Sequence, residues 1–475
     1  MPFPGTLVAL AATTALAASC ATNPVTGRRE LSLIGEQQEI AMGLEAAKSA
    51  SSEMGVYPDS VLQRYVNTLG MPLARASERP NLPWSFTVID DPVVNAFALP
   101  GGPLFVTRGI LAHMNSEAQL VSVLGHEIGH VTARHSVSQM SRAQLTQGLF
   151  VGAMILRPEL QQFGNLGSQA LGVMFLKFGR DDETQSDELG FKYMTNGGYD
   201  PAEMAEMFKT LDRTGGGSDR TPEWLSTHPN PGNRVARTNE RIAAWTRPAG
   251  PLKVNRDPFL QRLDGMVFGD DPRQGYFQQA TFLHPTLKFR FDFPSGWRTQ
   301  NSAQQVAGMS ATQDALLVLS GATGTPQQAL SQFLGQQGIQ SSGASNTTIN
   351  GLPAATAQFA VQTEQAVLAG YVTFVLLDGT TYRLLAYTDQ SKLGSYDRVF
   401  RGAMGSFQRL TDPQALNVKP NRLRVVQVRS ATTLAQFQQQ YPSVIPIDQL
   451  ALINGVDASS GSFPAGAWVK RVVAQ

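Results

Sequence analysis

The stretch that decides the fold lies at residues 116–135 and reads SEAQLVSVLGHEIGHVTARH. Ser116 suits the N-cap of a helix, and Gln119, three residues later, would complete a capping box. Apolar side chains then recur at helical spacing, which predicts a long helix with a broad buried face: Leu120, Val121, Val123, Leu124, Ile128 and Val131.

At residues 126–130 this helix carries the motif HEIGH. His126 and His130 are four residues apart and share one helical face, so they can occupy two corners of a zinc tetrahedron. Glu127 is offset from them by one residue, which suits a general base acting on a zinc-activated water. His135 lies five residues beyond His130, on a different face, and we interpret it as structural. The motif predicts a catalytic site with one zinc ion per chain.

A zinc site of this kind needs a third protein ligand and leaves the fourth position open for water. The only cysteine lies far upstream, so the third ligand must be a histidine or a carboxylate. Glu183 is the best candidate, and Asp182 and Glu188 are alternatives. Asp187 shares a helical face with Glu183 and can accept a hydrogen bond from the second ring nitrogen of a zinc histidine.

Further motifs accompany the histidines, namely Asn95-Ala96-Phe97-Ala98-Leu99-Pro100-Gly101-Gly102, Ser186-Asp187-Glu188-Leu189-Gly190, Gly198-Tyr199-Asp200-Pro201 and Ser226-Thr227-His228-Pro229. Together they resemble the gluzincin family of zinc metallopeptidases that includes the CAAX-prenyl endopeptidases, HtpX and BepA, over about residues 23–245. The resemblance implies an α+β fold whose catalytic domain is mainly helical with a small edge-strand sheet. It implies a zinc endopeptidase in which His126, His130 and Glu183 bind the metal and Glu127 is the catalytic base.

The resemblance also implies roles for residues outside the metal shell. Asn95, Ala96 and Phe97 would lie on the edge strand that pairs with an extended substrate. His228 would approach the zinc and could close the site. Arg234 would reach the oxyanion that forms during hydrolysis. We therefore assign His228 and Arg234 to the catalytic set.

The amino terminus resembles an export signal. Residues 3–18 are apolar or small, and they are too few to span a membrane. They end in Leu16-Ala17-Ala18-Ser19-Cys20, which resembles the lipobox of bacterial lipoproteins, in which the cysteine is lipidated. We expect a signal peptide over residues 1–19 and a periplasm-facing lipoprotein of the outer membrane. The most apolar later segment, residues 148–156, is too short to cross a membrane.

The rest of the chain divides by composition. We assign residues 20–250 to the peptidase domain and residues 251–275, rich in Pro, Gly, Asp and Arg, to a linker. Residues 276–410 follow a strand pattern and predict an α+β domain on an antiparallel sheet, which resembles PsbP. Residues 422–475 predict a small strand–helix–helix–strand (βααβ) unit that resembles a LysM module and would bind peptidoglycan.

Charge and motifs together limit the function. A net charge of +1 gives no case for nucleic-acid binding. We expect a zinc endopeptidase of the bacterial cell envelope that cleaves protein or peptide substrates in the quality control of membrane or periplasmic proteins. Its membrane contact would run through a lipid at Cys20. The alternative is an envelope assembly factor or chaperone whose zinc site is capped by His228 and rarely active.

Overall fold

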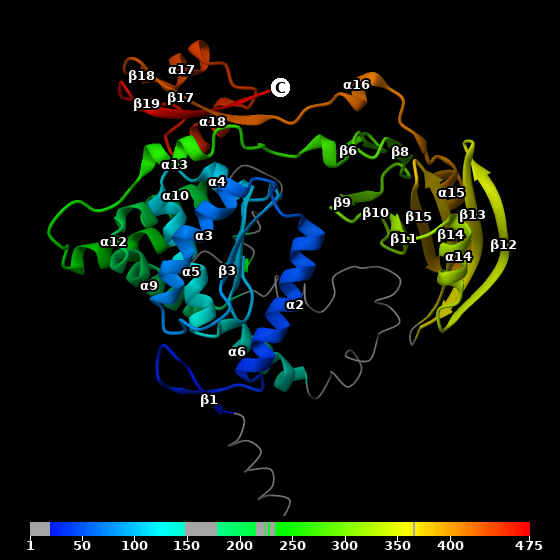
Figure 1. The fold of residues 1–475 in the computed structure, drawn as a ribbon, viewed down its shortest axis with the longest axis horizontal. Coiled ribbons are helices and arrows are strands. Elements are labelled where there is room, and N and C mark those ends of the chain that lie inside the picture. The colour runs from blue at the N-terminus through cyan, green and yellow to red at the C-terminus, as the bar shows by residue number, and fades with distance from the viewer. Residues whose placement is uncertain (1–19, 148–177, 215–223, 225–226, 229–232, 364–365) are drawn as a thin grey trace, which may run out of the picture. The chain divides into compact units, whose positions relative to one another are not determined.

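The computed structural model describes residues 20–147, 178–214, 224, 227–228, 233–363 and 366–475. They form two compact units (Figure 1). The first contains the described residues up to Asp270 together with Asn421–Gln475, and the second is Asp271–Pro420. The expected mixture is confirmed: the first unit is mainly helical, and the second is built on antiparallel strands. None of the described helices has the length and apolar character that a membrane crossing requires.

A small sheet lies beside the helices of the first unit. Its strands are β3 (Ser85–Ile89), β5 (Pro103–Thr107) and β4 (Ala96–Ala98), in that order, so β4 is an edge strand among the described strands. β3 runs parallel to β5, and β4 runs antiparallel to it. Alternation along β5 buries both faces of the sheet: Leu104 and Val106 join the main core, and Phe105 packs in a second cluster with Ala46 and Ala50 of the long helix before the sheet.

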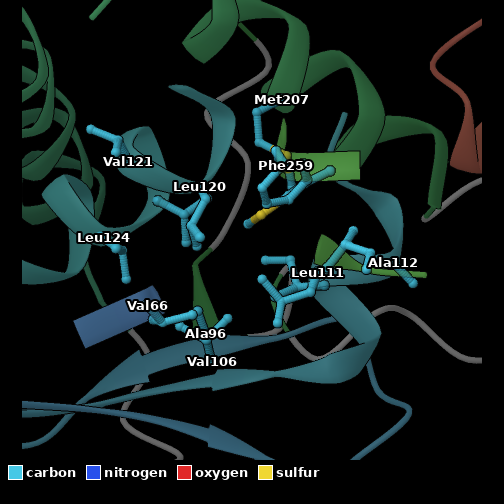
Figure 2. Packing of buried hydrophobic residues seen from close by; sticks show 14 of the residues in the cluster. Val66, Ala96, Val106, Leu111, Ala112, Leu120, Val121, Leu124, Met207 and Phe259 are labelled. Carbon is cyan, nitrogen blue, oxygen red and sulfur yellow. The ribbon is translucent and has the colours of Figure 1, made fainter. Parts of the chain in front are cut away.

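Helix α5 (Glu117–Thr132) is the centre of the first unit, and all of its residues are buried. In Figure 2, Leu120 and Leu124 of α5 lie near Val66 and near Val106 of the sheet. The other helices of the peptidase region are α2 (Glu36–Met54), α3 (Ser60–Arg75), α4 (Arg108–His113), α6 (His135–Gln147), α9 (Arg180–Asn196), α10 (Ala202–Thr214) and α12 (Arg234–Ala244). Ahead of them, β1 (Cys20–Thr22) pairs with β2 (Arg29–Leu31).

The start of α5 differs in one detail from the prediction. The Ser116 hydroxyl caps the helix as expected and accepts a hydrogen bond from the Gln119 amide. The Gln119 side chain does not return to Ser116. Its Oε1 accepts from the Asn115 amide, and its Nε2 donates to Glu203, so a capping box does not form. The hydrogen bond to Glu203 of α10 thus replaces the one that a capping box would need.

The segment predicted as a linker, residues 251–275, contributes side chains to the core of the first unit. It contains α13 (Arg256–Arg262), and Phe259, Leu260 and Leu263 are fully buried in the same cluster as α5. The Pro- and Gly-rich composition of this segment did not predict a short helix that buries Phe259 and Leu260.

The C-terminal module follows the predicted βααβ order. It consists of β17 (Arg422–Gln427), β18 (Thr432–Thr433), α17 (Leu434–Gln440), α18 (Ile447–Ile453), β19 (Ser462–Phe463) and β20 (Trp468–Val473). β17 pairs antiparallel with β20, and β18 with β19. The apolar side chains of the module belong to the same buried cluster as the peptidase helices. The module is therefore packed into the first unit.

The second unit holds two antiparallel sheets. Seven strands follow the order β12-β13-β14-β15-β11-β10-β9, and four follow β16-β8-β7-β6. Their bounds are β6 (Tyr276–Gln278), β7 (Thr281–His284), β8 (Phe289–Asp292), β9 (Arg298–Asn301), β10 (Gln305–Met309), β11 (Ala315–Ala322), β12 (Ile339–Ile349), β13 (Leu352–Gln362), β14 (Val367–Leu377), β15 (Thr380–Asp389) and β16 (Gln408–Arg409). The helices are α14 (Pro326–Leu334), α15 (Leu393–Gly405) and α16 (Pro413–Leu416), with 3-10 turns η3 (Pro272–Gln274) and η4 (Gln390–Lys392).

Candidate metal centre

Four buried side chains converge where α5 meets α9. His126 and His130 come from α5, Glu183 comes from the first turn of α9, and His228 follows α10 in the chain. One ligand atom of each lies within 4.8 Å of the others. Each side chain is at most 2% exposed. The structure thus brings together the three predicted ligands and the predicted closing histidine.

The distances between these atoms resemble the edges of a tetrahedron. His126 Nε2 lies 3.0 Å from His130 Nε2 and 3.3 Å from His228 Nδ1. The Glu183 carboxylate lies 3.4 Å from His130 Nε2, 3.6 Å from His126 Nε2 and 2.9 Å from His228 Nδ1. With metal–nitrogen bonds of about 2.0–2.1 Å, the ligand atoms of a tetrahedral zinc site are about 3.3 Å apart. The spacing therefore fits one ion.

Hydrogen bonding alone does not account for the cluster. His126 Nδ1 lies 2.9 Å from Asp187 Oδ1, so it carries the ring proton and Nε2 carries a lone pair. His130 Nε2 could donate to that lone pair across 3.0 Å, but Glu183 Oε2 is buried with no hydrogen-bond partner. A cation between these atoms would supply the missing partner. Imidazole and carboxylate ligands of this kind suit zinc.

The protonation states also suit a metal. Burial lowers the pKa of His126 to about 3 and lowers the pKa of His130, so both rings are neutral near pH 7. Burial alone would raise the pKa of Glu183, but His228 and His130 more than offset it and hold that pKa well below its usual value. Neutral imidazoles and an ionised carboxylate are the forms that bind divalent metals.

Small residues let α5 and α9 approach closely enough to form the site. Gly125 and Gly129 of α5 face Gly190 and Ser186 of α9. A Cβ atom on Gly190 would lie 2.9 Å from the backbone nitrogen of His126, which is closer than packing allows. The glycines therefore set the distance between the ligands of one helix and the carboxylate of the other.

Gly190→Ala is expected to lower the free energy of unfolding by about 1–3 kcal/mol, because the methyl group forces the two helices apart. Zinc affinity should fall with it. Urea denaturation and a zinc competition titration measure the two effects. The matched control is Gly402→Ala on the exposed face of α15, where a Cβ has open space and a gain of about 0.5–1 kcal/mol is expected. Equal effects at both positions would contradict the packing argument.

Asp187 contacts the ring nitrogen of His126 that points away from the ligand set, and Arg234 contacts Asp187 in turn. The Arg234 side chain is buried and makes two hydrogen bonds to Asp187, Nε to Oδ2 at 2.9 Å and Nη2 to Oδ1 at 2.5 Å. Its guanidinium also stacks 4.0 Å above the Phe208 ring. Arg234 thus orients Asp187, and its Nη1 also lies 3.6 Å from Glu183 Oε2, while its predicted role at the oxyanion stays a prediction.

Glu127 lies beside the ligand set as the offset in the helix predicted. Burial raises its pKa well above the usual value, and the Glu183 carboxylate adds to the rise. Its carboxylate accepts the backbone N–H of Ala98 from β4, and Oε1 is 3.6 Å from His228 Nε2. A buried carboxyl group with a raised pKa is suited to take up and release a proton.

His228 occupies the space between the metal ligands and Glu127. Its Nδ1 faces the ligand set and its Nε2 faces Glu127. The ring of Trp224 stacks on it, with centroids 4.2 Å apart and planes at 22°. His228 is therefore the fourth member of the cluster and lies between the other three side chains and Glu127.

His135 was assigned a structural role from the sequence, yet it contacts a ligand. Its Nδ1 lies 3.0 Å from His130 Nδ1. The helical-face argument failed because α5 ends at Thr132 and Arg134 turns the chain with a φ of 58°. α6 then begins at His135 and returns it to the site. The change of helix could not be read from the histidine spacing.

The predicted substrate strand is only partly positioned as expected. Leu99 donates its N–H to Pro103, and Thr107 donates to the Asn95 carbonyl. In an antiparallel ladder this alternation turns the backbone of Phe97 toward β5 as well. The Phe97 ring is also buried. Phe97 and Asn95 therefore support the hairpin and do not offer a free edge.

The outward backbone groups of β4 belong to Ala96 and Ala98. The N–H of Ala98 already reaches the Glu127 carboxylate. Of the three predicted substrate residues, only Ala96 turns its backbone groups away from β5, and it is fully buried. The period of two along a strand would have revealed this once the register with β5 was known.

Two sequence assignments concern parts of the chain that are not described. The signal peptide at residues 1–19 and the apolar segment at residues 148–156 lie outside the described residues. The backbone of Cys20 is described as the first residue of β1.

Comparisons with known proteins agree with this centre. Residues 60–242 match the family model described as peptidase family M48. The beta-barrel assembly-enhancing protease of Escherichia coli (strain K12) is 30% identical over 237 residues, which is 48% of this chain and 48% of that protein. The mitochondrial metalloendopeptidase OMA1 of Schizosaccharomyces pombe is 30% identical over 229 residues, 46% of this chain and 65% of that protein. The chain thus spans about half the length of the assembly-enhancing proteases that it matches.

Among solved structures, cyanobacterial PsbP from Synechocystis covers 27% of this chain and 91% of its own, at 14% identity and a TM-score of 0.24. That likeness is too slight to assign the fold of the second unit. The family match, in contrast, covers the site itself, because residues 60–242 include all four converging side chains and Glu127. Over residues 60–242 the chain therefore matches peptidase family M48, and the relatives named above include a metalloendopeptidase.

Proposed function

We propose that the protein is a zinc-dependent endopeptidase of the bacterial cell envelope. The observation that carries the proposal is the convergence of His126, His130 and Glu183 with Glu127 at their side. Three protein ligands and an adjacent carboxylate are the composition of a hydrolytic zinc site. A bound zinc ion supplies the positive charge that acidifies a water molecule and polarises the peptide carbonyl.

The residues around the proposed zinc ion have separate roles in proton transfer and in positioning the ligands. Glu127 takes the proton of the attacking water and later gives it to the leaving amine, which its raised pKa favours. Asp187 fixes the ring of His126, and Arg234 fixes Asp187. No other described carboxylate lies beside the ligand set in a comparable position, so the base is assigned to Glu127.

The edge strand β4 would give the substrate its direction. An extended polypeptide that pairs with the backbone groups of β4 that face away from β5, other than the Ala98 N–H held by Glu127, would pass beside Glu127 and the ligand set. Such pairing uses the peptide backbone and selects for unfolded or extended segments over folded ones. Unfolded protein substrates are therefore the class that the site favours.

The N-terminal segment supports a position close to a membrane. Asn23 lies three residues beyond Cys20, and its side chain donates to the carbonyl of Ala133, directly after α5, at 3.2 Å. A lipid on Cys20 would therefore hold the metal centre near the outer-membrane surface without a long tether. Misassembled membrane or periplasmic proteins are then the natural substrates, as the name of the assembly-enhancing relatives suggests. The C-terminal βααβ module is the candidate contact with peptidoglycan.

A second function is favoured by His228. Its Nδ1 lies 2.9 Å from Glu183 and 3.3 Å from His126 Nε2, which completes a four-ligand shell. A closed shell is typical of structural zinc sites, and a catalytic one keeps a position open. In this alternative the protein is an envelope assembly factor or chaperone that cleaves only when His228 leaves the metal.

Cleavage of unfolded casein, followed with and without a metal chelator, tests both functions. An endopeptidase should lose cleavage with the chelator and regain it when zinc is restored. His228→Ala should raise kcat if His228 caps the metal, because it opens the fourth position. Cleavage by the variant alone would favour the capped alternative. If neither protein cleaves although both bind zinc, the endopeptidase proposal is wrong.

A further inference from the structure

His135 makes contacts on both of its ring nitrogens, and it is only 3% exposed. Nδ1 lies 3.0 Å from Nδ1 of His130, the ring nitrogen that points away from the ligand set. Nε2 lies 2.9 Å from Oε1 of Gln185, on α9. A buried histidine thus connects a metal ligand of one helix to a neutral amide of the helix that carries the other ligand.

The surroundings decide which nitrogen of His135 holds the hydrogen. On the Nε2 side are two acceptors, the Gln185 oxygen and the Asp182 carboxylate at 3.8 Å. On the Nδ1 side are the His130 ring and the hydroxyl of Ser186 at 3.3 Å, which can donate. The hydrogen therefore belongs on Nε2, and Nδ1 offers a lone pair.

This tautomer determines the state of His130. To bond a lone pair on His135 Nδ1, the His130 ring must donate from its own Nδ1. Its remaining nitrogen, Nε2, then has a free lone pair, and it lies 3.4 Å from Glu183 within the ligand set. The contact also fixes the rotation of the ring, which Phe178 covers with its centroid 4.0 Å away.

The two metal histidines are thus held by different acceptors. His126 is held by the carboxylate of Asp187, which carries a negative charge that Arg234 balances. His130 is held by a neutral imidazole. Partners of this kind are known to orient metal ligands and commonly change metal affinity by about 10- to 100-fold when removed.

We propose that His135 is a positioning residue for His130, which sets the tautomer and the ring orientation that aim Nε2 at the metal. The inference rests on the proposed metal site. It requires an acceptor at the place of Nδ1 and does not require an imidazole as such. This distinguishes it from a role in which His135 merely fills space in the core.

Two isosteric variants test that requirement. In His135→Asn the amide oxygen can take the place of Nδ1, whereas in His135→Gln the amide reaches the place of Nε2 and leaves His130 without an acceptor. Zinc affinity, measured by competition with a chromophoric chelator, should fall by about 10- to 100-fold in His135→Gln and His135→Ala. It should stay within about threefold of the parent in His135→Asn.

His113→Asn is the matched control. His113 is also buried, but its Nδ1 faces the Gly109 carbonyl within α4, and it is not part of the ligand set. This variant should change thermal stability and leave zinc affinity unchanged. Thermal unfolding of each metal-free protein shows whether a variant has simply lost its fold.

The outcomes separate this inference from the proposed function. Equal zinc affinity in His135→Asn and His135→Gln, whether weakened or intact, would overturn the positioning role. The expected difference between these variants supports it even if the parent protein binds zinc and does not cleave, which would count against the endopeptidase alone. A parent protein that binds no zinc would overturn both.

Discussion

Glu127→Gln is expected to keep its zinc and to lower kcat for casein cleavage by about 100- to 10,000-fold. The amide has nearly the shape of the carboxylate, and Glu127 is not among the four converging side chains, so the ion should stay bound. The amide cannot take a proton from water, and the general-base step is lost. Zinc content is measured by atomic absorption, and cleavage is measured on the zinc-loaded protein.

Glu117→Gln is the matched control for this variant. Glu117 lies on the same helix and is also buried, but its carboxylate accepts hydrogen bonds from Tyr65, Tyr199 and Asn255. Losing that charge should lower stability and leave kcat of the folded protein close to the parent value. Undiminished cleavage by Glu127→Gln would remove Glu127 from the mechanism. A matching loss in Glu117→Gln would point to a general effect of the α5 charges.

Local periodicity carried much of the site prediction. His126, Glu127 and His130 share one helix, so their relative directions follow from the helical repeat alone, and the structure places them accordingly. Glu183 needed a second helix to cross the first, and this crossing depends on Gly125 and Gly190 meeting without side chains. The glycines were visible in the sequence, but their pairing across 65 positions was not.

Residues that act through contacts distant in sequence were harder to place. Arg234 and Asp187 are 47 positions apart, and nothing in either segment reveals that the guanidinium contacts this carboxylate. The predicted direction of the His135 side chain was wrong for a different reason: it assumed that α5 continues to His135, and α5 ends at Thr132. The direction of the Phe97 backbone could not be predicted either, because it depends on the register between β4 and β5, which the turn at residues 99–103 sets.

Composition placed the boundaries of the second unit, Asp271 and Pro420, inside the predicted connections, but it did not reveal which residues of those connections are buried. The segment at residues 251–275 looks like a linker because Pro, Gly and charged residues interrupt it. Burial depends on where the few apolar residues point. Phe259 points into the core (Figure 2), and Leu260 belongs to the same buried cluster. The C-terminal module resembles an independent unit by its element order, yet its apolar face is completed by the peptidase helices.

Lys470 shows how firmly the module is joined. It lies on β20, is fully buried, and donates from Nζ to the carbonyls of Ala112 and Met114 at the end of α4, at 2.9 and 2.6 Å. Burial lowers its pKa well below the usual value for lysine. A buried amine held by two carbonyls of another part of the chain is costly to place unless both bonds are made.

Lys470→Ala is therefore expected to lower the free energy of unfolding of the first unit by about 3–5 kcal/mol. Two carbonyls at the end of α4 lose their donor, and a cavity opens where the side chain lay. Because α4 leads directly into α5, zinc release during urea denaturation should shift to lower urea together with the fluorescence change. If the urea midpoint of zinc release is the same in Lys470→Ala as in the parent protein, the module unfolds by itself.

Arg429→Ala provides the comparison within the same module. Arg429 is exposed, so its removal should change the free energy of unfolding by less than about 0.5 kcal/mol. If Lys470→Ala behaves like Arg429→Ala, the module is an appendage whose contacts with α4 contribute little. If the two differ as expected, the peptidase fold requires its last 55 residues, Asn421–Gln475, for stability. Any binding of peptidoglycan by the module would then act on the same cooperative unit that holds the metal.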